Sequence, residues 1–448
     1  MPIKKESTHM KDTACISVVG LGKLGLCTAA CFADKGFRVI GVDVDIGKIN
    51  KINKGISPIQ ETGLPELVRK VGKNLSATDN YNEAIGKSDV TFIVVATPSL
   101  ADGRFSNEYL EKSVHKIAEA LKRKEKYHLV VVTSTVMPQT TENVVKFLLE
   151  KNSGKLCGRD FGLAYNPEFI ALGSVIHDFL NPDMILIGES SKKDGDILQK
   201  IYEKACENRP SFARMSPVNA EITKISLNCY ITTKITFANS LAAICEKVRG
   251  ADAHIVSKAL GMDTRIGSKY IKPGLGFGGP CFPRDNQAFA SFARMLNAQA
   301  KLAEMVDEVN RDQVMRVVNK AKEILADLKK GKHARIGVLG LSYKPNTPII
   351  EDSQALNIVQ MLKNEGYSLS VFDPQALENA RSVLGDSVRY AKDKDACLEG
   401  ADLAVIAVPW AEFKNINLKK LNKKTTILDC WCLLENPAKA DIHYLGIG

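Results

Sequence analysis

A single cysteine lies in an unusually glycine- and proline-rich stretch of this chain. Residues 265–285 read RIGSKYIKPGLGFGGPCFPRD, in which Cys281 is followed four residues later by the carboxylate of Asp285. The five glycines and three prolines predict a rigid loop that other groups approach closely. Four basic residues lie near the thiol in sequence, and cations favour the reactive thiolate: Arg265, Lys269, Lys272 and Arg284. The stretch is a candidate for covalent catalysis, with a buried structural cysteine as the alternative.

A second motif predicts a dinucleotide site near the N-terminus. The GLGKLG of residues 20–25 follows a short apolar run and opens a helical pattern, and Asp43 ends the next apolar run. In this context Gly20 permits a tight turn, Gly22 lets the backbone approach a pyrophosphate, and Gly25 allows close helix–strand packing. A carboxylate at Asp43 accepts from ribose hydroxyls and repels a 2′-phosphate, which predicts NAD rather than NADP. Lys48 is either a ribose contact or a solvated helix lysine.

The elements around these motifs alternate in a βαβ rhythm. Short runs rich in Val and Ile show little alternation, as expected of strands covered on both faces. Helical segments such as 24–35 lie between them. The predicted strands are 16–20, 39–43, 90–97, 129–135, 161–165 and 184–188. This pattern is typical of a doubly wound α/β sheet.

The chain changes character after about residue 219. Residues 220–249 predict one long helix, and more helix follows to about 328, interrupted by the glycine-rich segment 273–280. A second α/β unit follows, with strands predicted at 336–341, 369–373, 403–408 and 426–429. The predicted fold class is α/β: two Rossmann-like doubly wound domains (13–215 and 331–448) joined by a central helical dimerisation region (216–330).

Composition excludes several classes of protein. The 448 residues are 45% hydrophobic, without an apolar run long enough for a membrane span, and the charged N-terminus lacks a signal sequence. The net charge of +10 is spread along the chain, which favours solubility or anionic small ligands over nucleic acid. An odd, scattered set of 11 cysteines predicts reduced thiols in the cytoplasm and no metal site.

The motifs together resemble those of the UDP-glucose/GDP-mannose dehydrogenase family. The resemblance spans nearly the whole chain and keeps the family's order of motifs. These are GLGKLG with GVDVD, VVATPS at 94–99, STV at 134–136, YNPEF at 165–169, EITKISLN at 221–228, GFGGPCFPRD at 276–285 and GLSYKPNT at 340–347. The resemblance implies an enzyme that oxidises a nucleotide-sugar C6 alcohol twice, with two NAD in turn, through a thiohemiacetal and a thioester on Cys281.

The same resemblance assigns roles to individual residues. Lys224 and Asn228 would stabilise developing oxyanions, and their i, i+4 spacing puts both on one helix face. Asp285 would orient or activate the hydrolytic water, while Thr135 and Glu168 would take part in proton transfer. A solvated lysine, a helix asparagine, a capping threonine and a loop glutamate are the corresponding structural alternatives.

Further contacts are implied on both ligands. NAD would contact Leu24, Thr97 and Thr135 in addition to the glycine motif, Asp43 and Lys48. The nucleotide-sugar would contact Glu168, Lys224, Asn228, Tyr270, Lys272, Gly278, Tyr343 and Lys344, with Arg265 reaching the substrate of a partner subunit. Basic side chains suit a diphosphate. The 331–448 domain would then bind the nucleotide-sugar, and the protein would be a homodimer or larger.

Besides Pro280, which stands where Ser or His commonly precedes the cysteine, three positions depart from the family pattern and bear on the substrate. Leu172 stands where a second carboxylate is usual, Glu351 lies where an arginine is usual after the SYKPNT motif, and Cys432 belongs to a DCWC segment that replaces Asp-Gly-Arg. Phe282 and Pro283 after the cysteine favour the UDP-glucose branch. A UDP-N-acetylhexosamine or GDP-mannose is the alternative substrate. A non-catalytic nucleotide-sugar-binding protein and a one-step alcohol dehydrogenase are alternatives of other classes.

Overall fold

The computed structural model describes residues 14–416, 425–435 and 441–448. The start of the predicted first domain, residue 13, lies outside this range. The chain divides into two compact units, Met1–Ile225 and Ser226–Gly448. Within the described residues, no helix is long and apolar enough to cross a membrane.

An eight-stranded sheet organises the described part of the first unit, in the order β3-β2-β1-β4-β5-β6-β7-β8. Neighbouring strands pair in parallel except β6 and β7, which are antiparallel. The strands are β1 Cys15–Val19, β2 Arg38–Val42, β3 Leu75–Thr78, β4 Val90–Ile93, β5 His128–Val132, β6 Phe161–Tyr165, β7 Met184–Glu189 and β8 Ser211–Met215. The order reverses between β1 and β4, which is where open α/β sheets bind ligands at their carboxyl edge.

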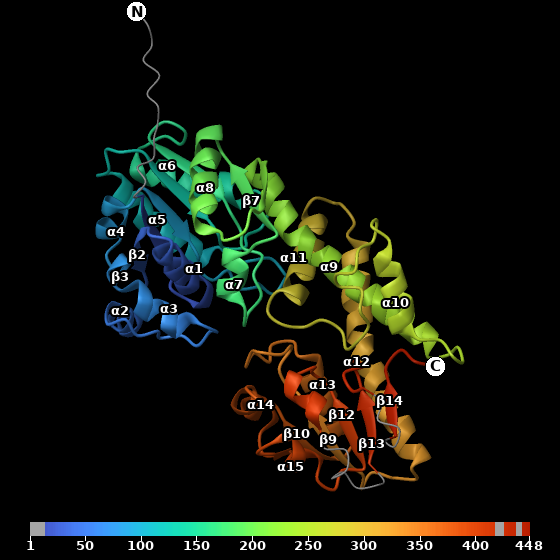
Figure 1. Cartoon of the computed structure of the whole chain (residues 1–448). Helices are drawn as coiled ribbons and strands as arrows, with labels where there is room; N and C mark the ends of the chain where they lie inside the picture. The colour runs from blue at the N-terminus through green and yellow to red at the C-terminus, as the bar shows by residue number, and fades with distance from the viewer. Residues whose placement is uncertain (1–13, 417–424, 436–440) are drawn as a thin grey trace, which may run out of the picture. The chain divides into compact units, whose positions relative to one another are not determined.

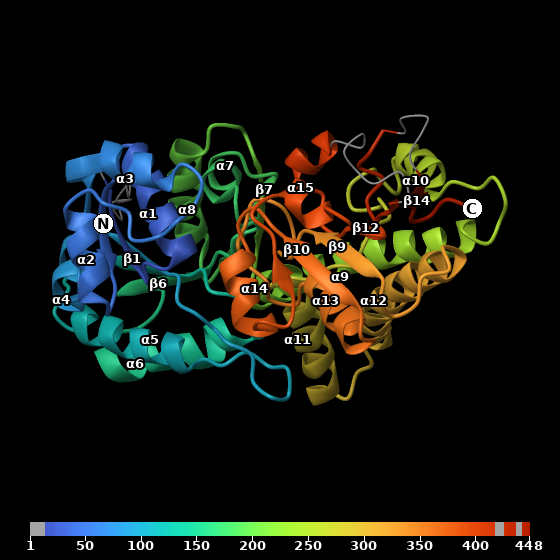
Figure 2. The same cartoon turned by 90° about the horizontal axis from the view of Figure 1, so that it is seen from below.

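Helices cover both faces of this sheet (Figure 2). On one face, α1, α3, α7 and α8 pack over a core that includes Val18, Phe32 and Phe92; on the other, α4, α5 and α6 pack over a core that includes Val19 and Ile93. The helices are α1 Lys23–Asp34, α2 Ile46–Asn53, α3 Leu64–Val71, α4 Tyr81–Lys87, α5 Glu108–Leu121, α6 Phe147–Ser153, α7 Val175–Leu180 and α8 Lys192–Ala205, with short turns η1 Gly72–Asn74 and η2 Thr141–Lys146. Because consecutive strand residues face opposite cores, little alternation survives in the sequence.

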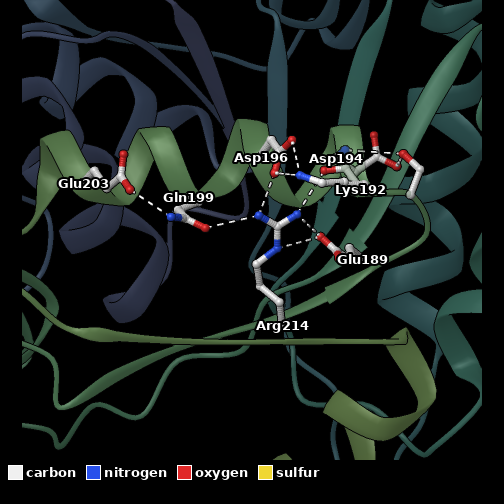
Figure 3. Close-up of polar contacts among 8 residues, drawn as sticks. Glu189, Lys192, Asp194, Asp196, Gln199, Glu203 and Arg214 are labelled. Atoms are coloured by element: carbon white, nitrogen blue, oxygen red, sulfur yellow. Dashed lines mark hydrogen bonds and ion pairs between the residues drawn. The ribbon is translucent and has the colours of Figure 1, made fainter.

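The outer strand β8 is fastened to its neighbours by one arginine. Arg214 donates from Nε and Nη2 to Glu189 of β7 at 2.9 and 2.6 Å, and from Nη1 to Asp196 and Gln199 of α8 at 2.6 and 3.1 Å (Figure 3). These hydrogen bonds to carboxylates are charge-assisted and geometrically specific. They hold an edge strand whose residues are half-buried or exposed.

The second unit contains a helical part and a second sheet (Figure 1). Helix α9 (Pro217–Cys245) begins in the first unit and continues through the second, followed by α10 Ala253–Met262, α11 Phe282–Met295 and α12 Lys301–Asp327. The 27-residue α12 turns its apolar residues, among them Val314, Val317 and Ile324, into the core of the sheet that follows. Arg316 of α12 donates to the carbonyl of Asn239 on α9 at 3.2 Å, which joins the two long helices.

The second sheet is parallel throughout its described strands, in the order β11-β10-β9-β12-β13-β14. Its strands are β9 Arg335–Leu339, β10 Ser368–Phe372, β11 Arg389–Tyr390, β12 Leu403–Ile406, β13 Thr426–Asp429 and β14 Ile442–Tyr444. Its helices are α13 Gln354–Asn364, α14 Leu377–Leu384 and α15 Lys394–Leu398, with the turn η3 Ala411–Asn415. The predicted fold class, two Rossmann-like α/β sheets with a helical region between them in sequence, is confirmed.

Several sequence-based bounds need correction. The strand predicted at 90–97 ends at Ile93 and the one at 129–135 ends at Val132, because the residues that follow leave the sheet to form loops at its carboxyl edge. The strands β3, β8, β11 and β14 were absent from the prediction. All four strands stand at a sheet edge, where the apolar signal is weak.

Candidate active site

The glycine loop at the carboxyl end of β1 has the geometry of a phosphate cradle. Gly20 has φ +93°, and an added Cβ would come 2.4 Å from the carbonyl oxygen of Val94. At Gly25 an added Cβ would come 1.8 Å from the carbonyl oxygen of Gly20. At Gly22 it would meet nothing within 4 Å, and no side chain caps the N-terminus of α1 there. The protein's own packing thus requires two of the three glycines, while the third leaves room for a ligand at a helix N-terminus.

Asp43 lies directly after β2 and lines the same edge. Its Oδ2 accepts from the backbone N–H of Leu21 at 2.8 Å and its Oδ1 from that of Asp45 at 3.0 Å. The ammonium of Lys48 lies 4.0 Å from Oδ2, so this lysine pairs with Asp43 instead of standing alone in solvent. Asp43 stays half-buried with acceptor capacity for ribose hydroxyls. The geometry of Gly22 and Asp43 fits an NAD molecule.

Two loops that follow β4 and β5 are tied together at the same edge. The hydroxyl of Thr97 donates to the carbonyl of Thr135 at 2.7 Å. The hydroxyl of Ser134 accepts from the N–H of Val95 at 2.9 Å and donates to its carbonyl at 2.7 Å. Thr97 and Thr135, both predicted to contact NAD, are therefore held next to each other by side chain–backbone hydrogen bonds.

The first unit also brings together Glu168 and Lys224, which lie far apart in sequence. The ammonium of Lys224 donates to the backbone carbonyl of Glu168 at 2.6 Å and lies 4.6 Å from the ring centre of Phe169. Burial raises the pKa of the Glu168 carboxyl to about 7, against the opposing effects of Lys224 and the Thr28 hydroxyl. A carboxyl with this pKa can accept or release a proton near neutral pH.

Cys281 occupies the N-terminal cap position of helix α11 and is exposed. Its carbonyl accepts from the N–H of Asp285 at 2.8 Å, which closes the first turn of the helix. The N-terminus of a helix carries partial positive charge. The other exposed cysteine is Cys432. The structure thus places the Cys281 thiol at an exposed position on a helix N-terminus.

Behind this thiol, Asn228 and Asp285 form a buried pair. The amide nitrogen of Asn228 donates to Oδ2 of Asp285 at 2.6 Å, and Nε of Arg284 lies 3.5 Å from Oδ1. Asp285 is only 1% exposed. A buried carboxylate with its charge partner and hydrogen bond in place has a fixed orientation.

The glycine-rich loop before Cys281 packs closely on the 343–353 segment of the same unit. A Cβ added at Gly278 would come 2.2 Å from the carbonyl oxygen of Asp352, and one at Gly279 would come 2.5 Å from the ring of Tyr343. The N–H of Gly279 donates to the carbonyl of Glu351 at 3.0 Å. These contacts explain why glycine is needed there, and they bring the predicted substrate residues Gly278, Tyr343 and Lys344 to one place.

Three other predicted substrate residues are exposed. The guanidinium of Arg265 pairs with Asp263 at 2.6 Å and its side chain is 87% exposed. Tyr270, with φ +65°, is also exposed, as is Lys272.

The three departures from the family pattern have distinct surroundings. Leu172 packs against the core of the first unit. Glu351 is exposed and holds Gly279 only through its backbone carbonyl. Cys432 is exposed with φ +50°, next to Trp431, whose ring fills the space that a Cβ on Gly274 would need.

Sequence reasoning missed two acidic residues that the structure makes prominent. Glu221 begins the EITK motif and is 1% exposed, and Asp373 directly follows β10 and is equally buried. An acid inside a long apolar helix, and an acid at the end of an apolar strand, were the available signals. Among the described residues, no group of three His, Cys, Asp or Glu side chains is arranged to hold a metal ion.

Comparisons with known proteins agree with this geometry. Three family models match: the NAD binding domain of the UDP-glucose/GDP-mannose dehydrogenase family over residues 14–206, its central domain over 218–312 and its UDP binding domain over 337–436. UDP-glucose 6-dehydrogenase AglM of Haloferax volcanii is 38% identical over 401 residues, 89% of this chain and 92% of that protein. UDP-glucose 6-dehydrogenase TuaD of Bacillus subtilis is 36% identical, covering 97% of this chain and 93% of that protein.

A solved structure extends the similarity to the fold. The UDP-glucose dehydrogenase of the hyperthermophilic archaeon Pyrobaculum islandicum superposes with a TM-score of 0.87 at 32% identity, over 100% of both chains. Motifs, fold and sequence identity over the whole chain lead to one conclusion. The chain belongs to the UDP-glucose/GDP-mannose dehydrogenase family, whose members are NAD-dependent nucleotide-sugar oxidoreductases.

Proposed function

We propose that this chain oxidises the C6 alcohol of UDP-glucose to the carboxylate of UDP-glucuronate with two NAD. The observation that carries the proposal is the exposed Cys281 thiol at the N-terminus of α11, one turn before the buried Asp285. A one-step alcohol dehydrogenase has no use for such a thiol. The relatives named above, which are UDP-glucose dehydrogenases, support the choice of sugar.

The proposed reaction proceeds in four steps. When bound, NAD would supply the hydride acceptor for each of the two oxidations. The alcohol first loses a hydride and a proton to give the aldehyde, and Cys281 adds its sulfur to the aldehyde carbon, so that a thiohemiacetal forms. Loss of a second hydride and the hydroxyl proton gives the thioester, and water then releases the acid and the thiol.

The side chains have complementary tasks in this scheme. Glu168, with its pKa of about 7, exchanges protons with the reacting oxygen directly or through Thr135 and water. The Lys224 ammonium and the Asn228 amide stabilise the developing oxyanions. Asp285 orients the hydrolytic water. Asn228 already donates to Asp285 at 2.6 Å, which couples these last two tasks.

We further infer a homodimer in the cytoplasm. Tyr230, Phe237 and Ile244 of α9 are 66%, 56% and 63% exposed and recur every seven residues, so they share one face of the helix. A second copy would cover this apolar face, and a Phe237→Asp variant that sediments like the wild type would contradict it. All 11 cysteines are free, as suits a reducing compartment.

The yield of NADH tests the reaction. With limiting UDP-glucose and excess NAD, we expect two NADH per sugar, followed by absorbance. One NADH per sugar would mean an ordinary alcohol oxidation. No NADH with UDP-glucose, but turnover with a UDP-N-acetylhexosamine or GDP-mannose, would move the substrate to that sugar. No NADH formation with any of these nucleotide-sugars would favour a nucleotide-sugar-binding protein.

A further inference from the structure

A buried carboxylate outside the assigned machinery holds one end of a loop of the proposed site. Glu221 on α9 accepts from the backbone N–H of Gln139 at 2.5 Å through Oε2 and from that of Thr141 at 2.8 Å through Oε1. Its side chain is 1% exposed. The partners are about 80 residues away in sequence, so this contact is purely tertiary.

The carboxylate acts as a helix cap that the local sequence does not supply. Thr141 begins the π-helical turn η2, and the preceding Thr140 provides no side-chain cap. The first N–H groups of a helix need an acceptor when they are buried. Gln139 also has φ +74°, a conformation that a non-glycine residue keeps only when its surroundings require it. Glu221 therefore fixes a backbone turn that would otherwise relax.

The turn ends the loop 133–140, which contains Thr135. The other end of this loop is held by the Ser134 hydrogen bonds to Val95 and by Thr97, which donates to the carbonyl of Thr135 at 2.7 Å. Glu221 adds a tertiary anchor from α9 at the η2 end of the loop. One helical turn after Glu221 on α9 comes Lys224, whose ammonium binds the Glu168 carbonyl. Glu221 thus joins the loop of Thr135 to the helix of Lys224.

We propose that Glu221 is a positioning residue, whose carboxylate sets Thr135 relative to Lys224 by capping η2. The proposal rests on the proposed function, because it assumes that Thr135 and Lys224 act on the substrate or the cofactor. Glu221 itself acts through the loop, without touching either ligand. A purely structural cap would affect stability and leave turnover by the folded enzyme unchanged.

The first test is the Glu221→Gln variant of the full chain, which keeps the shape and removes one of the two acceptors. We expect kcat to fall about ten- to hundredfold, with KM for UDP-glucose within about twofold of the wild type, because misplaced groups slow chemistry more than binding. If this variant does not fold, Glu221→Asp, which keeps both acceptors on a shorter side chain, should show the same pattern to a smaller extent.

Asp194→Asn is the matched control. Asp194 is a fully buried carboxylate of the same unit that accepts from Tyr127 at 2.6 Å and from Ser191 at 2.8 Å, at the N-terminus of α8. The Asp194→Asn variant should have a lower Tm than the wild type and an unchanged kcat at a temperature where it is folded. An equal loss of kcat in both variants, or an unchanged kcat in Glu221→Gln, would overturn the proposal.

A double variant shows whether Glu221 acts through Thr135. In a Thr135→Ala background, Glu221→Gln should lower kcat by much less than in the wild type, because coupled groups are not additive. Fully multiplicative effects would overturn the proposed route.

Hydrogen exchange separates this proposal from the proposed function. The amides of Gln139 and Thr141 should be protected in the wild type and should exchange at least about tenfold faster in Glu221→Gln, while the α8 amides stay unchanged. If no nucleotide-sugar is oxidised, the proposed function fails, yet this measurement still decides whether Glu221 holds the loop. Unchanged exchange at both amides would contradict the positioning role.

Discussion

The two sheets of this protein begin their glycine loops in the same way and then diverge. In the first, Gly20 has φ +93° and donates to the carbonyl of Val42 at 2.8 Å; in the second, Gly340 has φ +98° and donates to that of Phe372 at 2.7 Å. The residue after each glycine donates to an aspartate at the end of the neighbouring strand, Leu21 to Asp43 and Leu341 to Asp373, both at 2.8 Å.

The two aspartates differ in how much of their hydrogen-bond acceptor capacity remains free. Asp373 is 1% exposed and also accepts from the N–H and hydroxyl of Ser342, the indole of Trp410 and the backbone N–H groups of Gln375 and Ala376. Asp43 is half-buried, and its hydrogen bonds from the protein come from two backbone N–H groups. One fold motif therefore contains a carboxylate with acceptor capacity left for a ligand in one unit and a fully engaged structural carboxylate in the other.

The helix that follows each loop diverges as well. Helix α1 begins at Lys23, directly after the glycine loop, with Gly22 at its cap and no side-chain capping bond. Helix α13 begins only at Gln354 and is capped by the Ser353 hydroxyl. A helix N-terminus without a side-chain cap can bind a phosphate group through its free backbone N–H groups. In a capped helix, one of these N–H groups already has an acceptor. The dinucleotide therefore belongs to the first unit.

The largest expected effect separates the chemistry of Cys281 in the second unit from NAD binding in the first. Cys281→Ala should lower acid formation by at least about 10³-fold, because the variant cannot hold the aldehyde for the second oxidation. NAD binding to the first unit should keep its Kd, as measured by fluorescence titration. Wild-type acid formation by the variant would remove Cys281 from the mechanism.

A pair of variants tests the comparison directly. Asp43→Ala should raise KM for NAD about tenfold or more, since one or two hydrogen bonds from ribose to a charged acceptor are lost. Asp373→Ala should leave KM for NAD unchanged and lower the free energy of unfolding by about 3 kcal/mol or more, because several buried donors lose their acceptor. Equal effects of both variants on KM for NAD would erase the distinction between the two aspartates.

A smaller effect concerns the pH dependence of stability in the first unit. Burial raises the pKa of Glu168 to about 7, so the folded state binds its proton more tightly than the unfolded chain does. The associated stability is fully present below the unfolded pKa, near 4.5, and is lost as pH rises through about 7. Glu168→Gln should therefore raise the free energy of unfolding at pH 8 by about 1–2 kcal/mol while it lowers kcat. Denaturant melts at pH 5 and pH 8 measure this difference. The prediction is wrong if the free energy of unfolding at pH 8 is no higher in the variant than in the wild type.

Much of the fold was predictable because its signals are local. Runs of Val and Ile gave the central strands, and GLGKLG between a strand and a helix predicted the first loop. The antiparallel pairing of β6 with β7, and the edge strands β3 and β8, were not predictable from these signals. Such strands depend on neighbours, such as the Arg214 contacts that fasten β8, more than on their own apolar content.

The candidate site divides in the same way. The identities of Cys281, Lys224, Asn228 and Asp285 came from motifs, and their catalytic roles stay predictions. That Asn228 donates to Asp285, that Lys224 binds the Glu168 carbonyl, and that Glu221 caps a turn near Thr135 depends on contacts between segments distant in sequence. A motif records which group is present, whereas its orientation comes from partners supplied elsewhere in the chain.

The sequence by itself determined that this chain has two glycine-turn α/β sheets, a dinucleotide motif and one cysteine in a rigid loop, because each is encoded by residues close together in the chain. Only the tertiary structure decided which aspartate keeps free acceptor capacity and which carboxyl has a raised pKa. It also decided which carboxylate caps the loop of Thr135. Burial and hydrogen-bond partners set these properties, and both arise from the packing of distant segments.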